Sequence, residues 1–213
     1  MNIYIIAQYL NLYDQGEDIF FKLGRKLVSN GHDVTIFTIN RAIDLDLGKK
    51  KIGLIQKYGL KIIAFNVDYD RQYGRFKKMY AHLKFARMSQ AQGHRLPKPN
   101  LIIAASPPLT AVWPALKLGK FYQVPVVMDI RELWPDGPVQ RGSLKNKLLI
   151  RVFKGLEQKA YQQASRIIVS GKSIAEAVKV RVADQTKLKI ILDMTDNRSL
   201  IEQYEHALGE FKV

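Results

Sequence analysis

The sequence predicts an α/β fold built on a mostly parallel sheet. Short apolar runs recur along the chain and stop abruptly at turn residues or charges, as strands buried on both faces do. Segments with apolar residues at helical spacing alternate with these runs. We therefore expect a single Rossmann-like domain with about six or seven strands flanked by helices.

Length and composition fit such a domain. The chain has 213 residues, of which 47% are hydrophobic and 25% charged, as in globular rather than disordered proteins. It has no cysteine, which excludes a disulfide framework and a cysteine-based zinc site. The longest apolar runs are too short to span a membrane, and the N-terminus lacks the marks of a signal peptide. We therefore expect a cytoplasmic protein.

The net charge is the one unusual bulk property. There are 34 Lys and Arg against 19 Asp and Glu, a formal net charge of +15. Such a surface attracts nucleic acid, anionic lipid headgroups or phosphorylated substrates. The charge alone permits a nucleic-acid-binding protein, but the sequence has no motif that recognises nucleic acid, so we do not expect that partner.

In the first half of the chain, strands and helices alternate. Apolar runs predict strands at Asn2–Gln8, His32–Thr38 and Leu60–Val67. Helical spacing predicts helices at Asp18–Ser29 and Asp70–Gln92. A turn-rich loop is expected at 11–17, and the basic, irregular stretch 40–57 is expected to be a loop with a short helix.

The predicted helix at 70–92 is basic and amphipathic. Its apolar residues fall on one face, namely Phe76, Met79, Tyr80, Leu83 and Ala86. Its cations fall largely elsewhere, among them Arg75, Lys77, Lys78, His82 and Lys84. An ordinary surface helix packed on the sheet accounts for this pattern, and so does a helix docked at a membrane surface.

The second half continues the alternation. Strands are expected at 100–105, 126–128, 166–170 and 187–192, and helices at 110–122, 144–164 and 171–182, with a loop at 137–143. The Rossmann-like domain is then expected to occupy residues 1–196. Residues 197–213 contain one further helix, capped by Ser199.

The most informative stretch is QVPVVMDIRELWPD, at 123–136. Its apolar run ends at Asp129, and Arg131, Glu132 and Trp134 follow. In open α/β sheets, ligands bind beyond the carboxyl ends of the strands, so these side chains could form a site. Equally, Asp129 and Arg131 could pair with each other while Trp134 fills a hole in the core.

Several segments resemble the bacterial family 4 glycosyltransferases, GT-B enzymes that build capsule, O-antigen and exopolysaccharide units. DIRELWP resembles their DVRDLWP-type segment, GHDVTIFT their GHEVTVLT and PNLIIAASPPLT their PDLIIASSPPL. The fucosamine-transferase-like members are the most similar. The resemblance covers the first, acceptor-binding half of a family member, and it implies that the second, donor-binding domain is absent.

The resemblance implies transfer of a sugar from a nucleotide-sugar to an acceptor hydroxyl, without a metal ion. Asp129 and Glu132 are then the candidates for orienting or deprotonating the acceptor. Arg131 could hold an acceptor phosphate or pair with either acid, and Trp134 could stack on a sugar ring. The nucleotide-sugar is a substrate, and no cofactor is implied.

Two further positions are candidates by the same resemblance. The loop that contains Gly16 corresponds to a glycine-bearing loop beside the acceptor in the family. Ser106 could donate a hydrogen bond to the acceptor, or it could cap the helix that follows.

The resemblance also implies partners. These are a lipid-linked or saccharide acceptor, the inner face of the cell membrane through Arg75, Lys77, Lys78 and Lys84, and a separate donor-binding domain. This chain alone is then expected not to bind a nucleotide-sugar tightly. The alternative is a non-catalytic or split-subunit binding module that needs a separate donor-binding chain.

Overall fold

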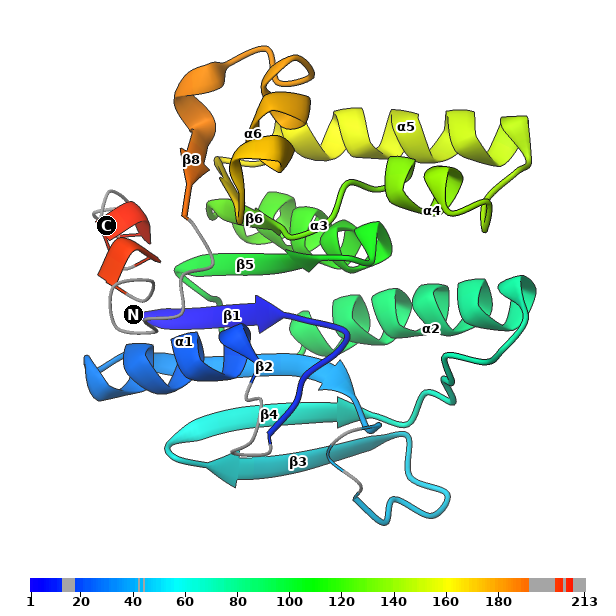
Figure 1. The fold of residues 1–213 in the computed structure, drawn as a ribbon. Helices are drawn as coiled ribbons and strands as arrows, with labels where there is room; N and C mark the ends of the chain where they lie inside the picture. Colours follow the sequence, from blue (N-terminus) through cyan, green and yellow to red (C-terminus); the bar gives the residue numbers. More distant parts are fainter. Residues whose placement is uncertain (13–17, 42, 44, 192–201, 205, 209–213) are drawn as a thin grey trace.

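The fold is a single α/β domain around one eight-stranded sheet. The computed structural model describes residues 1–12, 18–41, 43, 45–191, 202–204 and 206–208. The strand order is β3-β4-β2-β1-β5-β6-β7-β8 (Figure 1). The strands are β1 (Asn2–Ile6), β2 (Asp33–Ile39), β3 (Ile52–Lys57), β4 (Leu60–Phe65), β5 (Leu101–Ser106), β6 (Val126–Ile130), β7 (Arg166–Val169) and β8 (Leu188–Ile190).

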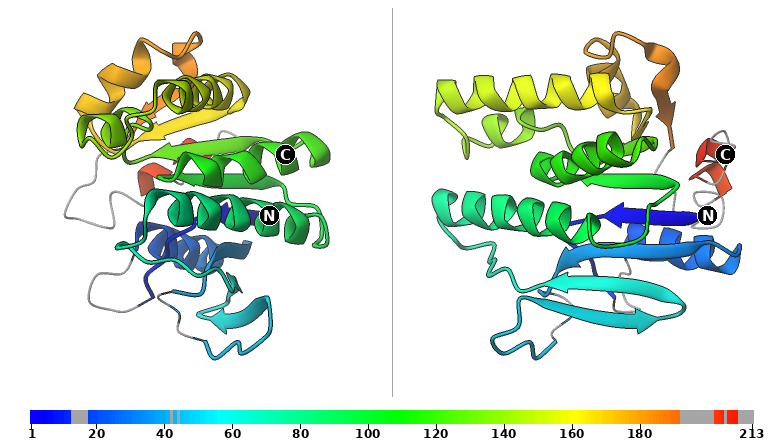
Figure 2. Two further views of the ribbon diagram at one scale, coloured as in Figure 1. Left: turned by 90° about the vertical axis from the view of Figure 1, so that its right-hand side faces the viewer. Right: turned by 180° about the vertical axis from the view of Figure 1, so that it is seen from behind.

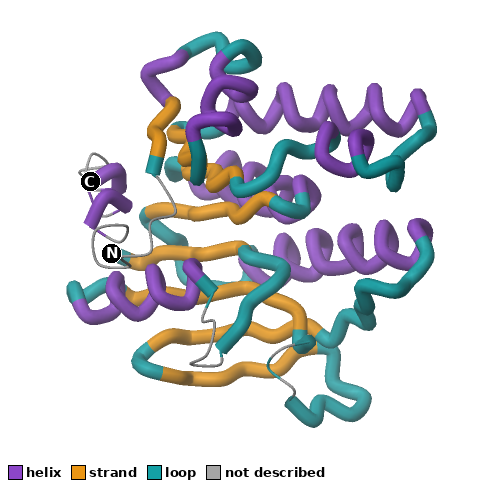
Figure 3. Tube along the Cα trace, viewed as in Figure 1, coloured by secondary structure: helices purple, strands orange, loops and turns teal. Residues whose placement is uncertain are grey.

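All neighbouring strands are parallel except the hairpin of β3 and β4. The predicted fold class is therefore confirmed, with one strand more than expected. In Figure 3 the strands form a single continuous layer. Strands β5 and β6 are buried at every residue, and β1, β2, β4 and β7 at all but one, because helices cover both faces of that layer.

The helices divide unevenly between the two faces of the sheet. They are α1 (Ile19–Ser29), α2 (Arg75–Gly93), α3 (Val112–Tyr122), α4 (Asp136–Gln140), α5 (Lys147–Gln163) and α6 (Lys172–Lys179), and residues 202–204 and 206–208 are also helical. Side chains of α2, α3, α5 and α6 form one core with the sheet, and α1 packs on the opposite face with Tyr204, Ala207 and Leu208. The right view of Figure 2 shows α2, α3 and α5 in front of the sheet.

Two sequence expectations are wrong and need correction. Part of the expected loop with a short helix at 40–57 is strand β3, whose side chains alternate in exposure and which pairs antiparallel with β4. Tyr58 and Gly59 join these strands, and both have positive φ, as the favoured two-residue hairpin requires. The expected loop at 137–143 also contains most of the short helix α4.

The face by which α2 packs differs from the expected one. Phe76, Tyr80 and Leu83 are exposed, and the solvent reaches 92% of Phe76. The buried side is formed mainly by small residues, namely Ala81, Ala86, Ser89 and Gly93, together with Phe85. A side chain at Gly93 would overlap Leu118 of α3, so small residues let α2 approach α3 closely and the large apolar ones face outward.

The order of the strands defines one topological switch point at the carboxyl edge of the sheet. The chain runs from β1 to one side of the sheet and later reaches β5, which lies on the other side of β1. Ile6 of β1 is level with Ala104 of β5. The residues that follow β1 and β5 are therefore neighbours at the topological switch point, where ligands of open α/β sheets bind.

Among the described residues, no helix combines the length and the hydropathy needed to span a membrane. The helical residues 202–204 and 206–208 lie in the segment expected to be a C-terminal helix. Its expected cap, Ser199, lies outside the described residues.

Candidate functional site

The end of β6 and the residues after it, 129–136, are built around a buried ion pair. Asp129 is completely buried, and Nε of Arg131 lies 3.2 Å from its Oδ1 atom. Nη2 of Arg131 donates a hydrogen bond of 3.0 Å to the Tyr204 hydroxyl, and the guanidinium lies 5.5 Å from the Phe20 ring. The Asp129 carboxylate therefore does not face an open cleft, and its contact with Arg131 is the one that the pairing alternative describes.

The next residues of this stretch are also engaged within the protein. Glu132 forms an ion pair with Arg141, which closes the loop between β6 and the end of α4. The Trp134 ring meets Phe153 of α5 edge to face, with centroids 4.6 Å apart. That packing is what the core-filling alternative predicts for Trp134.

The remaining sequence candidates have different positions. Ser106 is buried at the end of β5, and its carbonyl accepts a 2.9 Å hydrogen bond from the Arg131 amide. Pro108, not Ser106, occupies the N-cap position of the following helical turn. Gly16 lies outside the described residues. Ser106 and Arg131 are thus brought together, through their backbones.

A largely buried charge cluster holds α4, α5 and Arg181, two residues after α6, together. Arg181 donates hydrogen bonds of 3.1 and 3.2 Å to the two carboxylate oxygens of Glu157, and it also pairs with Asp136. The Tyr161 hydroxyl donates a 2.7 Å hydrogen bond to Glu157. Burial raises the pKa of Glu157, against the effects of Tyr161 and Arg181. Because every member is engaged inside the fold, we read this cluster as structural.

A second polar cluster lies beyond the carboxyl ends of β1 and β4, and the sequence analysis missed it. Gln8 lies just beyond β1, and its side chain is almost fully buried. The distance to Nδ1 of His82, on α2, is 2.9 Å from Nε2 of Gln8 and 3.1 Å from its Oε1. The Tyr9 hydroxyl lies 3.5 Å from the same nitrogen. Tyr69, after β4, packs its ring 5.0 Å from that of Tyr9 and 5.6 Å from His82.

The electrostatics of this cluster favour neutral side chains. Burial, and then the nearby charge of Lys78, lower the pKa of His82 from its ordinary 6.5 to about 4. Burial and the hydrogen bond with Tyr69 raise the pKa of the Tyr9 hydroxyl. At neutral pH the cluster therefore offers uncharged hydrogen-bonding groups beside aromatic rings.

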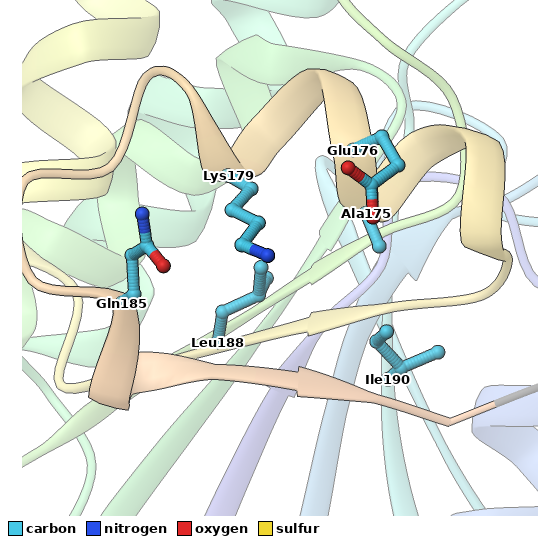
Figure 4. A pocket seen from close by; sticks show the side chains of 6 residues that line it. All are labelled: Ala175, Glu176, Lys179, Gln185, Leu188 and Ile190. Atoms are coloured by element: carbon cyan, nitrogen blue, oxygen red, sulfur yellow. The ribbon is translucent and has the colours of Figure 1, made fainter.

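A small pocket elsewhere has less to offer a substrate. It lies at the far end of the sheet, between α6 and β8, and has a volume of about 190 Å³. Its lining consists of Ala175, Glu176, Lys179, Gln185, Leu188 and Ile190 (Figure 4). This volume is below the roughly 300–1,000 Å³ of usual ligand pockets. In the described part of the chain, no three His, Asp or Glu side chains gather to hold a metal ion.

Comparison with known families decides the identity of the domain. Residues 19–192 match the family described as Glycosyl transferase 4-like domain. The chain belongs to that family. The matched residues include the stretch that contains Asp129 and Trp134, and two of the four residues of the second polar cluster, Tyr69 and His82. Gln8 and Tyr9 precede the match. A search of curated protein sequences found no match.

Solved structures show the same fold at low sequence identity. A sucrose-phosphate synthase chain from Thermosynechococcus elongatus is 14% identical with a TM-score of 0.65, covering 99% of this chain and 98% of that one. Arabidopsis thaliana UGT89C1 complexed with UDP is 12% identical with a TM-score of 0.58, covering 92% of this chain and 52% of that one. The kitacinnamycin glycotransferase is 14% identical with a TM-score of 0.51, and the match covers 90% of this chain and 51% of that one. The glycosyl transferase 4-like domain thus corresponds to about half of the latter two chains and has a GT-B half-like fold.

The first prediction tests the role of Asp129. Asp129→Asn removes one charge of the buried pair and leaves Arg131 without its counter-charge, which typically costs about 3–5 kcal/mol. For a chain of this length we expect the melting temperature to fall by about 10 °C. The control is Asp33→Asn, because Asp33 forms an exposed ion pair with Lys61, a kind of pair that contributes about 0–1 kcal/mol. An unchanged melting temperature for Asp129→Asn would contradict the structural role and favour a functional carboxylate.

The second prediction follows from the lowered pKa of His82. In the unfolded chain this group binds a proton near pH 6.5, but in the folded chain only near pH 4. Its contribution is therefore complete above pH 6.5 and is lost as the pH falls from 6.5 towards 4. Between pH 7 and pH 5 we expect the free energy of unfolding to drop by about 2 kcal/mol through this group. Urea titrations should show the drop in the wild type and in His94→Gln, and a smaller one in His82→Gln.

Proposed function

We propose that this glycosyl transferase 4-like domain is the acceptor-binding half of an enzyme of capsule, exopolysaccharide or O-antigen synthesis. The reaction would transfer a sugar from a nucleotide-sugar to an acceptor hydroxyl. The observation that supports it most is the family match over residues 19–192, on a chain that spans about half of two similar glycosyltransferase structures. The polar residues beyond the carboxyl ends of β1 and β4 give an acceptor a place to bind, at the edge of the sheet where ligands of open α/β sheets bind.

The stretch after β6 has a supporting part in this proposal. Asp129 and Arg131 fix the end of β6, and their pair keeps the loop that carries Glu132 in place. The Glu132 side chain is 31% exposed, which makes it the carboxylate of this stretch that an acceptor could reach. Asp129 is then a positioning residue rather than a base in contact with the acceptor.

The donor half of the reaction is proposed to come from a separate domain. Such a domain would hold the nucleotide-sugar and neutralise the departing diphosphate. If no such partner acts with this chain, the remaining candidate is a binding module that recognises the acceptor without catalysing transfer.

The third prediction tests this division of labour. We expect titration calorimetry of the isolated chain with uridine and guanosine diphosphate sugars to show no tight binding, because the groups that hold the diphosphate lie on the other domain. Saccharide acceptors should still bind, so they serve as the positive control. Micromolar binding of a nucleotide-sugar to this chain alone would contradict the acceptor-half proposal.

A membrane surface is the partner that the outward face of α2 supports. Phe76, Tyr80 and Leu83 follow one another on this face at helical spacing, and all three are exposed. Basic residues surround them, namely Arg75, Lys77, Lys78, Lys84 and Arg87. Two of these cations also have partners in the fold, since Lys77 pairs with Asp68 and Lys84 donates to the Asn66 carbonyl. An exposed apolar stripe with basic flanks fits an interface with anionic lipid.

The fourth prediction tests this surface with vesicles that contain phosphatidylserine. Reversing Arg75 and Lys78 to Glu removes two attractive charges worth about 1 kcal/mol each, so binding should weaken by about 30-fold or more. Replacing Phe76, Tyr80 and Leu83 with Ser should weaken it separately, through lost apolar burial. The matched control reverses Arg25 and Lys26 on α1, which packs on the opposite face of the sheet. Equal sedimentation of all variants with the vesicles would remove the membrane role from α2.

A further inference from the structure

We propose that Gln8, Tyr9, Tyr69 and His82 form the binding site for a phosphorylated sugar, with His82 positioning one of its hydroxyl groups. This inference rests on the proposed function, because it names the ligand class of the same edge of the sheet. Four side chains from three separate parts of the chain make up the site. The structure brings them together beyond the carboxyl ends of β1 and β4.

The backbone holds Gln8 in a fixed position. Its carbonyl accepts a 3.1 Å hydrogen bond from the Ile39 amide and another of 3.1 Å from the Thr38 hydroxyl. The side chain of Gln8 is almost fully buried and is directed at Nδ1 of His82. Gln8 therefore orients the imidazole ring, as an outer partner orients a functional histidine.

The second nitrogen of His82 remains for a ligand. Among the described residues, Nε2 makes no hydrogen bond, and it is not one of the buried atoms that lack a partner. The Gln8 amide can either donate to Nδ1 or accept from it, so Nε2 either donates to a ligand oxygen or accepts from a hydroxyl. Because Lys78 lies nearby and the ring is largely buried, the imidazole stays neutral at physiological pH. A neutral imidazole suits an uncharged hydroxyl group.

Aromatic rings line the site beside this nitrogen. Tyr9, Tyr69 and His82 pack on one another, with ring centroids between 5.0 and 6.3 Å apart. Tyr9 and Tyr69 are partly exposed. Such rings present an apolar surface and a polar tip, which matches the C–H face and the hydroxyl groups of a sugar ring.

Two arginines add the attraction for phosphate. The Arg41 guanidinium lies 5.7 Å from the Tyr69 ring, and the charges of Arg41 and Arg71 both act on the Tyr9 hydroxyl. Both arginines are exposed. Guanidinium groups recognise phosphate through paired hydrogen bonds. A phosphorylated sugar is thus the ligand class that satisfies the neutral, aromatic and cationic parts of the site together.

The test uses the full chain, with glucose 1-phosphate, methyl glucoside and inorganic phosphate as probes. Titration followed by NMR of the histidine side chains gives both an affinity and a signature at His82. We expect glucose 1-phosphate to bind more tightly than either other probe and to shift the imidazole signals that disappear in His82→Gln. Loss of one hydrogen bond should weaken its binding about tenfold in His82→Ala.

Matched variants separate the parts of the site. The double variant Arg41→Gln, Arg71→Gln should bind glucose 1-phosphate more weakly than the wild type does, but its affinity for methyl glucoside should be unchanged. His94→Ala is the control, because His94 lies just beyond the C-terminal end of α2, against Phe121 and about three helical turns from His82. The amide spectrum of each variant verifies that its fold is intact.

Three results would overturn the inference. These are equal binding of glucose 1-phosphate to the wild type and His82→Ala, binding of inorganic phosphate as tight as that of the sugar phosphate, and no binding of any probe. In the first case a sugar still binds elsewhere on the chain, so the proposed function survives. The proposed function itself fails separately, if the isolated chain binds nucleotide-sugars tightly.

Discussion

The buried carboxylate of Asp129 is the constraint on which the second face of the sheet depends. A charge at the middle of a core is tolerated only when a partner and hydrogen bonds compensate it. Arg131 supplies the partner, and the hydroxyl of Tyr204, far along the chain, accepts a hydrogen bond from Arg131. Among the described residues, α1 and the helical residues near 204 are what covers this face. The ion pair therefore connects the interior strand β6 with the helical residues around Tyr204 that cover this face.

The same pair also shapes the edge of the sheet. The Arg131 amide is bonded to the Ser106 carbonyl, so the loops after β5 and β6 are joined at their first residues. Trp134 then docks on α5, and Glu132 closes on Arg141. Asp129, Arg131, Glu132 and Trp134, which look like a catalytic site in the sequence, thus largely hold the loops after β5 and β6 in place. The polar groups that remain for a ligand are those of Gln8, Tyr9, Tyr69 and His82, beyond the carboxyl ends of β1 and β4.

The alternation of apolar runs and helical segments predicted the fold because each element follows from local pattern. The exception is β3, where the alternation of Leu54, Gln56 and their neighbours lies inside a basic stretch that obscured it. The site was harder to predict. The sequence leaves open whether Asp129 and Arg131 pair with each other or form a site. Only the tertiary structure shows the pair and the Tyr204 hydroxyl that completes its contacts. The Gln8–His82 pair joins residues 74 positions apart, and no local pattern in a single sequence marks such a pair.

Helix α2 links the two surfaces that the proposed function needs. The inner side of α2 places His82 beside Gln8, beyond the carboxyl end of β1. Phe76, Tyr80 and Leu83 lie on the outer, exposed side of the same helix. In Figure 1, α2 begins on the side towards which β1, β2 and β4 point. A lipid-linked acceptor would have its hydrocarbon in the membrane and its phosphorylated sugar beside His82. One rigid helix carries both contacts, so docking of its outer face on a membrane would fix the distance of His82 from the lipid surface. That distance would decide which acceptor head groups reach His82.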